Sequence, residues 1–413
     1  MNFHIKTYGC KLNQADSEII KGFLFKKHKE TSREDADFVI LNTCGVIEKT
    51  ERKILKEAED LRRKGKKVII AGCLPVISLE KCEEVADGII GPSNLSSISA
   101  VIEKAMQGEK LIKIEKENID KSFYWQENKG HSLIVPIAEG CLGNCSYCAT
   151  KIARKNLVSF SSEKIVEKIK SSKAKEIQLT SQDLSVYGME KGNQGLVPLL
   201  KEVVKIERDF KIKLGMMNPG YTIKMMDELL DIFESDKVYK FIHLPLQSGS
   251  NDLLKKMNRT YLSEDFIKIS ESFRKRFKET IIATDIIVGH PLETEGDFEK
   301  TVKVLKKIKP EVVHIFKFSR RKGTEDFLLR DLPDRIKKDR SRVLTSLCQE
   351  INLERNKKYL NKSLEVLVVD EKKNNYLART NSGRAVILKK GEIGQHYKVK
   401  IIDYRWNYLI GKI

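Results

Sequence analysis

The sequence of 413 residues lacks any apolar run long enough to cross a membrane. Its longest apolar runs, such as VIIAGCLPVISL from Val68, fall well short of the roughly 20 residues that a membrane helix needs. The first residues, MNFHIKTYG, lack the apolar segment of a secretory signal peptide. These absences predict a cytoplasmic protein without membrane contact. The length is too great for one core and predicts two or three domains.

Acidic residues are scarce relative to basic ones. Lysine and arginine together number 77, against 58 for aspartate and glutamate, which gives a formal net charge of +19. A surplus of this size favours a polyanionic partner, because lysine and arginine contact phosphates and release the counterions around them. Many lysine-rich surfaces bind nothing, however, so the charge alone leaves the partner open.

The chain has eight cysteines, and their tight or strand-end settings favour metal ligation in a reducing compartment over disulfides. Cys141, Cys145 and Cys148 are spaced C-x3-C-x2-C within EGCLGNCSYC. Three thiolates this close can hold one face of a four-iron cubane, which leaves one iron open for another molecule. A zinc site would need a fourth ligand at a short spacing, whereas the nearest histidine, His131, lies ten residues before Cys141.

Residues 1–114 alternate predicted strands and helices, the pattern of a doubly wound parallel sheet. The strands FHIKTYG, FVILNT and KVIIAG are each followed by a cysteine, namely Cys10, Cys44 and Cys73. Because the carboxyl ends of parallel strands share one edge, we expect these thiols to form a second three-thiolate platform. The alternative is three small residues that fill strand-end turns. Cys82 falls inside the helical stretch SLEKCEEVA, which predicts a packing thiol.

Residues 127–355 contain six predicted strands with intervening helices. This repetition predicts a partial (β/α)6 barrel, whose site sits at the carboxyl ends of the strands. Polar residues stand in the loops at those ends: Thr180, Ser181, Gln182 and Asp183 after EIQL, and Gln247 and Ser248 in PLQSGS. The first group could instead form a turn and a helix cap.

Several other charged residues in this region have two interpretations. Arg320 and Arg321 follow the sixth strand and could hold a carboxylate or phosphate, or could form an exposed pair. Arg154 and Lys155, just past the cysteine motif, could neutralise a cluster or a nucleic acid. His243 and His290 are predicted to be packed strand-end residues rather than ligands.

From residue 356 onward the pattern changes to five short strands separated by turns, which predicts a small antiparallel barrel. The last 56 residues hold twelve lysines or arginines against five acidic residues. Tyr376, Tyr397, Tyr404 and Trp406 are interspersed among them. Basic residues mixed with aromatic ones suit single-stranded RNA, whose bases stack on the rings. For each ring, a place in the barrel core is the favoured alternative.

EGCLGNCSYC resembles the cluster motif of the radical S-adenosylmethionine (SAM) enzymes. The resemblance implies that SAM chelates the open iron and is cleaved by one electron to a 5′-deoxyadenosyl radical. It also implies that Tyr147 lies beside the adenine and that the segment from Thr180 to Asp183 holds the amino group of SAM. The segment with Gln247 and Ser248 would lie near SAM and substrate.

TYGCKLNQADSE, LNTCGV and AGCLP resemble the three N-terminal cysteine boxes of the methylthiotransferase family, and the last region resembles a TRAM domain. The resemblance implies an α/β protein with a cluster domain at 1–114, a radical SAM core at 127–355 and a TRAM-like RNA-binding barrel at 356–413. Its cofactors would be two [4Fe-4S] clusters and SAM. Its partners would be tRNA, at the anticodon stem-loop, and a low-potential electron donor, while the oligomeric state is left open.

EGCLGNCSYC, LTSQD and GMMNPG most resemble the branch of this family that acts on threonylcarbamoyladenosine, 3′ to the tRNA anticodon. The implied reaction replaces C2–H by C–S–CH3, and the carboxylate of that nucleoside would give Arg320 or Arg321 a partner. GCKLNQ also occurs in a bacterial branch, so isopentenyladenosine and a ribosomal-protein aspartate are alternative substrates. From a different class, a non-catalytic iron–sulfur protein that binds RNA or transfers electrons is the alternative.

Overall fold

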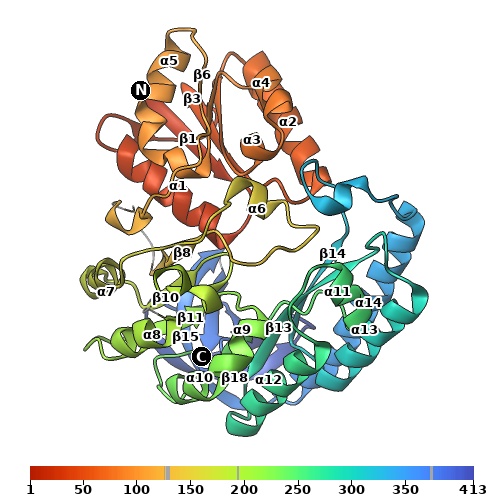
Figure 1. Ribbon diagram of the computed structural model, residues 1–413. Coiled ribbons are helices and arrows are strands. Elements are labelled where there is room, and N and C mark those ends of the chain that lie inside the picture. Colours follow the sequence, from red (N-terminus) through yellow and green to blue (C-terminus); the bar gives the residue numbers. More distant parts are fainter. Residues whose placement is uncertain (125, 127–130, 193–194, 373–374) are drawn as a thin grey trace. The chain divides into compact units, whose positions relative to one another are not determined.

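The computed structural model describes residues 1–124, 126, 131–192, 195–372 and 375–413. Within these residues the chain divides into two units, each of which is described by itself (Figure 1). The first unit comprises Met1–Asn128, Pro136–Lys164 and Ser319–Leu328, and the second comprises Lys129–Val135, Ile165–Phe318 and Leu329–Ile413.

The first unit contains a parallel sheet of six strands in the order β2-β1-β3-β4-β5-β6. Its strands are β1 (Asn2–Thr7), β2 (Lys29–Glu30), β3 (Phe38–Thr43), β4 (Lys67–Gly72), β5 (Gly88–Ile90) and β6 (Leu111–Lys113). The helices between them are α1 (Lys11–Leu24), α2 (Glu48–Arg63), α3 (Leu74–Ile77), α4 (Leu79–Val85) and α5 (Ile98–Met106). The predicted doubly wound parallel sheet is therefore confirmed, and β2 and β6 extend it at its two edges.

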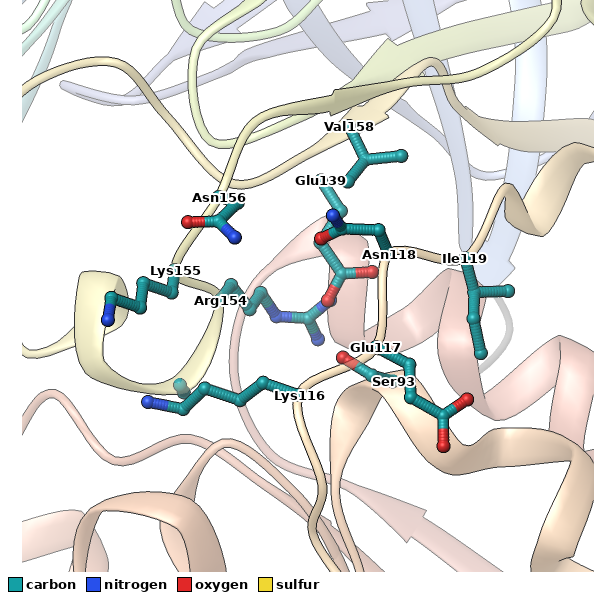
Figure 2. A pocket seen from close by; sticks show the side chains of 11 residues that line it. Ser93, Lys116, Glu117, Asn118, Ile119, Glu139, Arg154, Lys155, Asn156 and Val158 are labelled. Atoms are coloured by element: carbon teal, nitrogen blue, oxygen red, sulfur yellow. The ribbon is translucent and has the colours of Figure 1, made fainter.

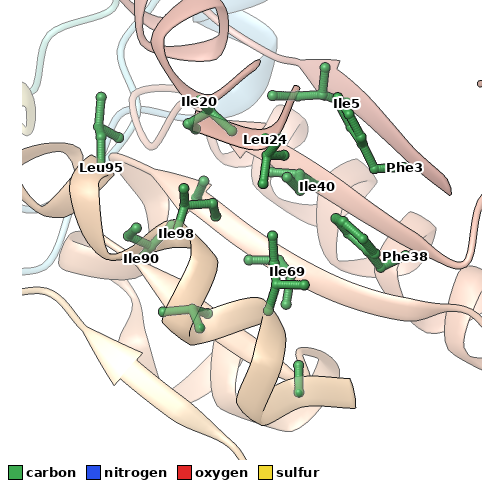
Figure 3. Close-up of a cluster of buried hydrophobic side chains, with 14 of the residues drawn as sticks. Phe3, Ile5, Ile20, Leu24, Phe38, Ile40, Ile69, Ile90, Leu95 and Ile98 are labelled. Carbon is green, nitrogen blue, oxygen red and sulfur yellow. The ribbon is translucent and has the colours of Figure 1, made fainter. Parts of the chain in front are cut away.

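Alternating side chains of β3 build a hydrophobic core on each face of this sheet. Phe38 and Ile40 pack against α1 and α5, whereas Val39 and Leu41 pack against α2 and α4. Figure 3 shows Phe38, Ile40 and Ile69 gathered with apolar side chains of the helices on the first face. Each fully buried side chain of this size contributes about 1.5–3 kcal/mol relative to exposure. This two-sided burial holds the ends of β1, β3 and β4 in fixed register.

The remainder of the first unit is a set of short elements around the cysteine motif. Strand β8 (Ala138–Glu139) pairs antiparallel with β9 (Val158–Ser159), and helix α6 (Thr150–Ala153) lies between them in sequence. Short 3-10 turns form at η1 (Pro92–Ser97), η2 (Lys121–Phe123) and η6 (Glu325–Leu328). The β8–β9 pair fixes both ends of the segment that carries Cys141, Cys145 and Cys148.

The second unit contains the six predicted strands of the central region. They are β7 (Ser132–Pro136), β10 (Glu176–Thr180), β11 (Lys211–Leu214), β12 (Phe241–His243), β13 (Ile281–Val288) and β14 (Val312–Lys317). They form two sheets, β11-β10-β7 and β12-β13-β14, and parallel bridges at Ile212↔Val238 and Met216↔His243 join the two. This arrangement is the predicted partial barrel, with β12, β13 and β14 in parallel register.

Helices follow the strands of this partial barrel in the predicted alternation. They are α7 (Ser162–Ser171), which begins in the first unit, α8 (Leu196–Val204), α9 (Pro219–Thr222), α10 (Met226–Ile232), α11 (Asn251–Lys256), α12 (Ser263–Arg276), α13 (Glu295–Ile308) and α14 (Asp334–Lys357). Short 3-10 turns follow β10 at η3 (Leu184–Val186) and η4 (Met189–Lys191), and another, η5 (Ile223–Met225), precedes α10. Cys348 lies buried in α14, as expected of a structural thiol.

The last strands close into a barrel in the order β15-β16-β17-β19-β18. They are β15 (Ser363–Lys372), β16 (Asn375–Thr380), β17 (Ala385–Leu388), β18 (His396–Tyr404) and β19 (Leu409–Lys412). The prediction of a small barrel is confirmed, but one pairing, β17–β19, is parallel. A closed ring with an odd number of strands cannot alternate direction throughout, so at least one pair must run parallel.

The aromatic residues of the barrel separate into two groups. Tyr376, Tyr397 and Tyr404 pack partly buried against the barrel core, which agrees with the favoured interpretation. Trp406 is instead exposed over 43% of its surface. Trp406 is therefore the ring of this group that is available to stack on a base.

Across the described residues, the structure contains no helix with both the length and the apolar character that crossing a membrane requires.

Candidate metal centre

The three N-terminal cysteines follow neighbouring parallel strands of the first unit. Cys10 stands at the N-cap of α1 after β1, Cys44 follows β3 directly, and Cys73 stands at the N-cap of α3 after β4. A side chain at Gly9, whose φ is +118°, would come within 2.8 Å of the Cβ of Cys44. The strand ends therefore bring these cysteines to one edge of the sheet, as predicted, and the approach requires glycine before Cys10.

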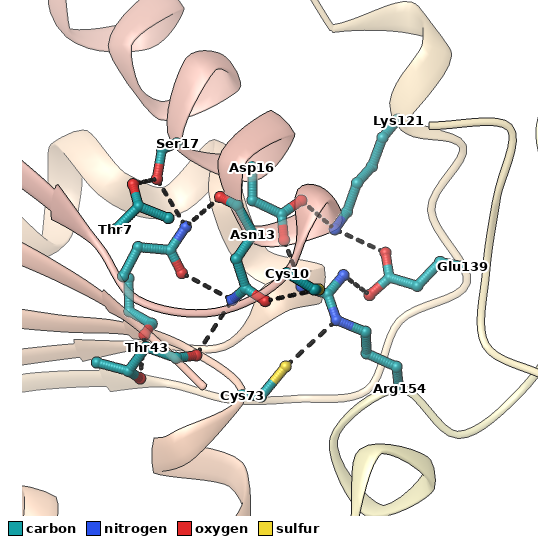
Figure 4. Close-up of polar contacts among 12 residues, drawn as sticks. Thr7, Cys10, Asn13, Asp16, Ser17, Thr43, Cys73, Lys121, Glu139 and Arg154 are labelled. Carbon is teal, nitrogen blue, oxygen red and sulfur yellow. Dashed lines mark hydrogen bonds and ion pairs between the residues drawn. The ribbon is translucent and has the colours of Figure 1, made fainter. Parts of the chain in front are cut away.

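Buried amide side chains fix the backbone around these cysteines (Figure 4). The amide of Asn13 on α1 donates to Asn42 Oδ1 at 3.2 Å and to the carbonyl oxygen of Thr43 at 3.1 Å. The amide of Asn42 donates back to the carbonyl of Asn13 at 2.8 Å, and the thiol of Cys10 donates to Asn13 Oδ1 at 3.2 Å. Removing one partner of such a network leaves buried donors unsatisfied at about 1–3 kcal/mol each.

Two thiols of this first group, those of Cys44 and Cys73, are shifted toward the protonated form. Burial raises the pKa of Cys44 to about 11, and the neighbouring Cys73 and Cys10 add to the shift. Burial also raises the pKa of Cys73, although the adjacent Arg154 opposes the rise. A soft metal stabilises the thiolate directly, so binding at these cysteines must release protons. Thiol ligands beside buried cations fit an iron–sulfur cluster, whose thiolate ligands carry negative charge.

The second group of cysteines lies in the loop between β8 and α6. The backbone N–H of Gly143 donates to the sulfur of Cys141 at 3.2 Å, and a side chain at Gly143 would stand 3.4 Å from that sulfur and 3.7 Å from the sulfur of Cys145. Lys151 Nζ donates to the carbonyl of Gly143 at 2.7 Å. Burial raises the pKa of Cys148, and Cys145 adds to the shift. The loop is therefore tightly folded around its sulfurs, and a backbone donor already faces one of them.

Two further contacts attach this loop to the rest of the first unit. Ser146 Oγ donates to Asp326 Oδ2 at 2.8 Å, which connects the loop to η6. At Gly140, with φ of +80°, a Cβ would stand 1.8 Å from the carbonyl oxygen of Asn156, so only glycine fits. Tyr147, predicted to lie beside the adenine of SAM, is half-buried within the same loop.

The loop after β10 shows both of the roles that the sequence left open. Oδ1 of Asp183 caps η3, accepting the N–H of Ser185 at 3.0 Å and the N–H of Asn218 at 3.0 Å. Within the described residues, Oδ2 of Asp183 and Oγ of Ser181 are buried without a hydrogen-bond partner. Burial raises the pKa of Asp183. An ammonium group would satisfy both free oxygens, which fits the predicted contact with the amino group of SAM.

The other residues predicted near SAM have distinct environments. Thr180 ends β10 and is 7% exposed, and Gln182 is half-buried. Gln247 is 8% exposed and has a left-handed backbone with φ of +64°, and its N–H donates to the carbonyl of Asp285 at 2.8 Å. Ser248 Oγ lies 3.4 Å from the hydroxyl of Thr301 and accepts from a backbone N–H two residues on. The hydroxyl of Ser248 therefore organises its own loop.

A polar cluster on β12, β13 and β14 was missed by the sequence analysis. Nε2 of His243 lies 3.0 Å from Oδ1 of Asp285, and the ligand atoms of His243, Asp285 and His314 lie within 4.8 Å of one another. Burial lowers the pKa of His314; Asp285 opposes this, while His243 and Lys213 add to it. The positive charge of Lys213 disfavours a bound cation here. Only the strand register, Asp285 opposite His314, brings these residues together.

The three remaining residues singled out in the sequence, His290, Arg320 and Arg321, have clear placements. His290 is buried and its ring packs against Phe318 at 5.1 Å, as expected of a packed residue. Arg320 is exposed and its Nε donates to the carbonyl of Phe327 at 2.9 Å. Arg321 is only 5% exposed, forms an ion pair with Glu51, and donates to the carbonyl of Val46 at 3.1 Å.

Replacing Glu51 by Gln is expected to lower the free energy of unfolding by about 3–5 kcal/mol, because Arg321 would be left buried without its counter-charge. Burial favours a high pKa for Glu51, but Lys81 and Arg321 hold its pKa below the ordinary value. Its contribution is therefore present above about pH 4.3 and is lost as the pH falls through the folded-state pKa. Urea unfolding of both proteins between pH 7 and pH 3 measures the difference.

The matched control for this measurement is Lys81→Ala. The side chain of Lys81 is 60% exposed and pairs with the same Glu51 at 2.8 Å. An exposed partner is expected to contribute less than about 1 kcal/mol. Equal losses for Glu51→Gln and Lys81→Ala would contradict the assignment of the buried ion pair.

Three family models match separate regions of the chain. The model of the Radical SAM superfamily matches residues 135–305, that of the uncharacterized protein family UPF0004 matches residues 2–91, and that of the TRAM domain matches residues 357–413. The superfamily match covers four of the six strands of the partial barrel in full, namely β10, β11, β12 and β13. The structure of a radical SAM methyltransferase, TsrM, from Kitasatospora setae superposes with a TM-score of 0.58 at 11% identity, over 79% of this chain and 77% of that one. This likeness supports the fold.

Relatives of similar length extend the comparison to the whole chain. A protein from Archaeoglobus fulgidus, named probable threonylcarbamoyladenosine tRNA methylthiotransferase, is 47% identical over 421 residues, which cover 100% of this chain and 99% of that one. A protein from Thermosipho africanus, named tRNA-2-methylthio-N(6)-dimethylallyladenosine synthase, is 34% identical over 97% of this chain and 96% of that one. Two three-cysteine groups, a radical SAM barrel and a TRAM barrel accompany this identity, and the chain belongs to the radical SAM methylthiotransferase family.

Proposed function

We propose that this chain methylthiolates C2 of N6-threonylcarbamoyladenosine, 3′ to the anticodon in tRNA. The observation that carries the proposal is the presence of two separate three-cysteine groups in one unit of the fold. The other two cysteines, Cys82 and Cys348, are buried in α4 and α14, and the pKa of Cys82 is raised to about 12 by burial. Neither group therefore gains a fourth thiol from them, which suits clusters that each keep one iron open.

The residues assigned to the two clusters follow from this arrangement. When bound, the two [4Fe-4S] clusters and SAM supply a 5′-deoxyadenosyl radical and an iron-held sulfur, which is the chemistry that an unactivated aromatic C–H requires. Cys141, Cys145 and Cys148 would hold one cluster, where the Gly143 N–H orients the Cys141 sulfur. The first group, Cys10, Cys44 and Cys73, would hold the other.

Residues of the second unit would bind SAM. Among the described residues, Ser181 Oγ and Asp183 Oδ2 are buried without a hydrogen-bond partner, which supports a contact with its ammonium group. Thr180, Gln182 and Gln247 lie at strand ends of the same barrel and are proposed to complete the site. Ser248 would act through the shape of its loop, because its hydroxyl is already engaged with Thr301. Tyr147 is proposed to lie against the adenine.

The tRNA partner is supported by charge and by the last barrel. The chain carries a net charge of +19, and the exposed Trp406 offers a stacking surface among basic residues. Arg320 is the better placed of the two adjacent arginines for the nucleoside carboxylate, because Arg321 is buried against Glu51. A tRNA substrate and thiols that must stay reduced favour the cytoplasm, and a low-potential electron donor would be required there.

The substrate choice is supported by the relatives. Identity is 47% to the protein named for threonylcarbamoyladenosine and 34% to the one named for dimethylallyladenosine. The first of these relatives covers 100% of this chain and the second covers 97%.

Anaerobically reconstituted protein is expected to convert threonylcarbamoyladenosine in tRNA to its 2-methylthio derivative when given SAM, dithionite and a sulfide source. Mass spectrometry of the digested nucleosides measures the product. The preparation should hold about eight irons per chain. A matched tRNA that carries isopentenyladenosine is expected to give little product. Preferred conversion of that tRNA would assign the second substrate class, and absence of 5′-deoxyadenosine would favour the non-catalytic alternative.

A further inference from the structure

A closed ring of four charged side chains lies beside the first cysteine group (Figure 4). Asp16 Oδ1 pairs with Lys121 Nζ at 2.8 Å, and Glu139 Oε2 pairs with the same nitrogen at 2.6 Å. Arg154 completes the ring through Nη1 to Glu139 Oε1 at 2.8 Å and through Nη2 to Asp16 Oδ2. The four side chains are between 1% and 9% exposed, and two cations balance two anions.

The third nitrogen of Arg154 faces the first cysteine group. Its Nε donates to the sulfur of Cys73 at 3.3 Å. Each arm of the guanidinium therefore meets a different acceptor, and only the planar fork of arginine presents donors in three directions at once. Lysine carries its three donors on a single nitrogen and lacks this planar fork. The ring keeps Arg154 charged, because Asp16 and Glu139 raise its pKa against the effect of burial.

Members of the ring also lie close in sequence to both cysteine groups. Asp16 lies on α1, which begins directly after Cys10, and Glu139 lies on β8, two residues before Cys141. Arg154 follows the second cysteine group by six residues, yet its side chain reaches the first group. All of these residues belong to the first unit.

We propose that Arg154 is a positioning residue that sets the reduction potential of the cluster on Cys10, Cys44 and Cys73. Arg154 also fixes the loops that hold this cluster relative to the loop of Cys141, Cys145 and Cys148. The inference rests on the proposed function, in that Cys73 is taken as a cluster ligand. An N–H donor to a cluster sulfur stabilises the reduced, more negative state and raises the potential. Arg154 thus acts on the other cluster rather than on the one that it follows in sequence.

A small pocket beside the ring offers a local control. Glu139 and Arg154 line it together with Lys155, Asn156 and residues 116–119, which follow β6 (Figure 2). Lys155 is adjacent in sequence and exposed, and in the part of the chain that the structure describes its side chain makes no hydrogen bond to Cys73. Lys155→Ala therefore removes one positive charge from the same region while leaving the Arg154–Cys73 hydrogen bond intact.

The test uses Arg154→Lys in the full chain with Cys141, Cys145 and Cys148 replaced by alanine, so that the first cluster alone is loaded. An EPR-monitored redox titration is expected to show a more negative midpoint. At the potential where the parent is half-reduced, the ratio of reduced to oxidised cluster should fall about tenfold, which corresponds to about 59 mV for one electron. Lys155→Ala should shift the midpoint much less. Equal shifts for the two variants would overturn the proposal.

A second background tests whether Arg154 acts on the cluster whose cysteines it follows in sequence. With Cys10, Cys44 and Cys73 replaced by alanine, Arg154→Lys should change the potential of the second cluster little. A larger shift there than in the first cluster would overturn the proposal. Full iron loading of this triple variant, at about eight irons per chain, would instead contradict the cluster assignment in the proposed function.

A failure of Arg154→Lys to load iron is also informative. In the chain that keeps all six cysteines, loss of the first cluster with retention of the second supports the proposal. If neither cluster loads, the same redox titration is performed on Asp16→Asn. This variant removes one hydrogen-bond acceptor of Arg154 and keeps the arginine. A shift in the same direction supports the proposal, and an unchanged midpoint overturns it.

Discussion

Cys145→Ala is expected to abolish SAM cleavage and to leave the first cluster loaded. The variant keeps two of three thiols in a loop that retains other contacts, since Gly143 N–H still faces Cys141 and Lys151 still holds the carbonyl of Gly143. The loop should therefore stay folded while its metal site loses a ligand. Production of 5′-deoxyadenosine should fall to the level of a control without enzyme.

Iron content distinguishes this outcome from general misfolding. The Cys145→Ala protein is expected to retain about four irons per chain, all on Cys10, Cys44 and Cys73. Cys348→Ala is the matched control, because Cys348 is a buried thiol in α14 that lies in the second unit. It should keep about eight irons and full SAM cleavage. Substantial 5′-deoxyadenosine from Cys145→Ala would contradict the assignment of the second cysteine group.

The positions of the cysteines could be predicted because they depend on local signals. Apolar runs that stop at glycine and cysteine identify strand ends, and parallel strands place those ends at one edge. Helical spacing around Cys82 likewise placed it in a packed helix, and the structure buries it completely. None of these inferences needs knowledge of which distant side chains meet.

The partners of Arg154 could not be predicted, because they come from three places in the sequence. Asp16, Cys73 and Glu139 accept hydrogen bonds from its guanidinium, and their separations from Arg154 range from 15 to 138 residues. The sequence offered only the idea that Arg154 neutralises a cluster or a nucleic acid. Its direction toward the first group is set by the packing of the cysteine-motif segment, Pro136–Lys164, with the N-terminal sheet in one unit.

The cluster of His243, Asp285 and His314 was missed for a related reason. Each residue lies in an apolar strand, where a single polar residue carries no periodic signal. The strand register places Asp285 opposite His314, and β12 adds His243 on the same side. Asp183 shows the opposite case: the sequence suggested both a cap and a ligand, and its two carboxylate oxygens divide these roles.

Cys44→Ala is expected to do the reverse of Cys145→Ala, sparing SAM cleavage and blocking methylthiolation. Cys44 is the central member of the first group, since its strand β3 lies between β1 and β4. Loss of its thiol should release the first cluster and leave about four irons on the second group. The preparation should form 5′-deoxyadenosine but no 2-methylthio nucleoside, measured by mass spectrometry of the same reaction.

Cys82→Ala provides the matched comparison, because it removes a thiol from the same unit. Cys82 is buried among Val85 and Ala86 in the hydrophobic core on the α2 and α4 face of the sheet. Its replacement should cost about 1 kcal/mol of stability and leave iron content and product unchanged. Full methylthiolation by Cys44→Ala would show that the strand-end cysteines do not converge on a working metal site. If Cys82→Ala lost as much iron as Cys44→Ala, the assignment of Cys44 rather than Cys82 to the first group would be contradicted.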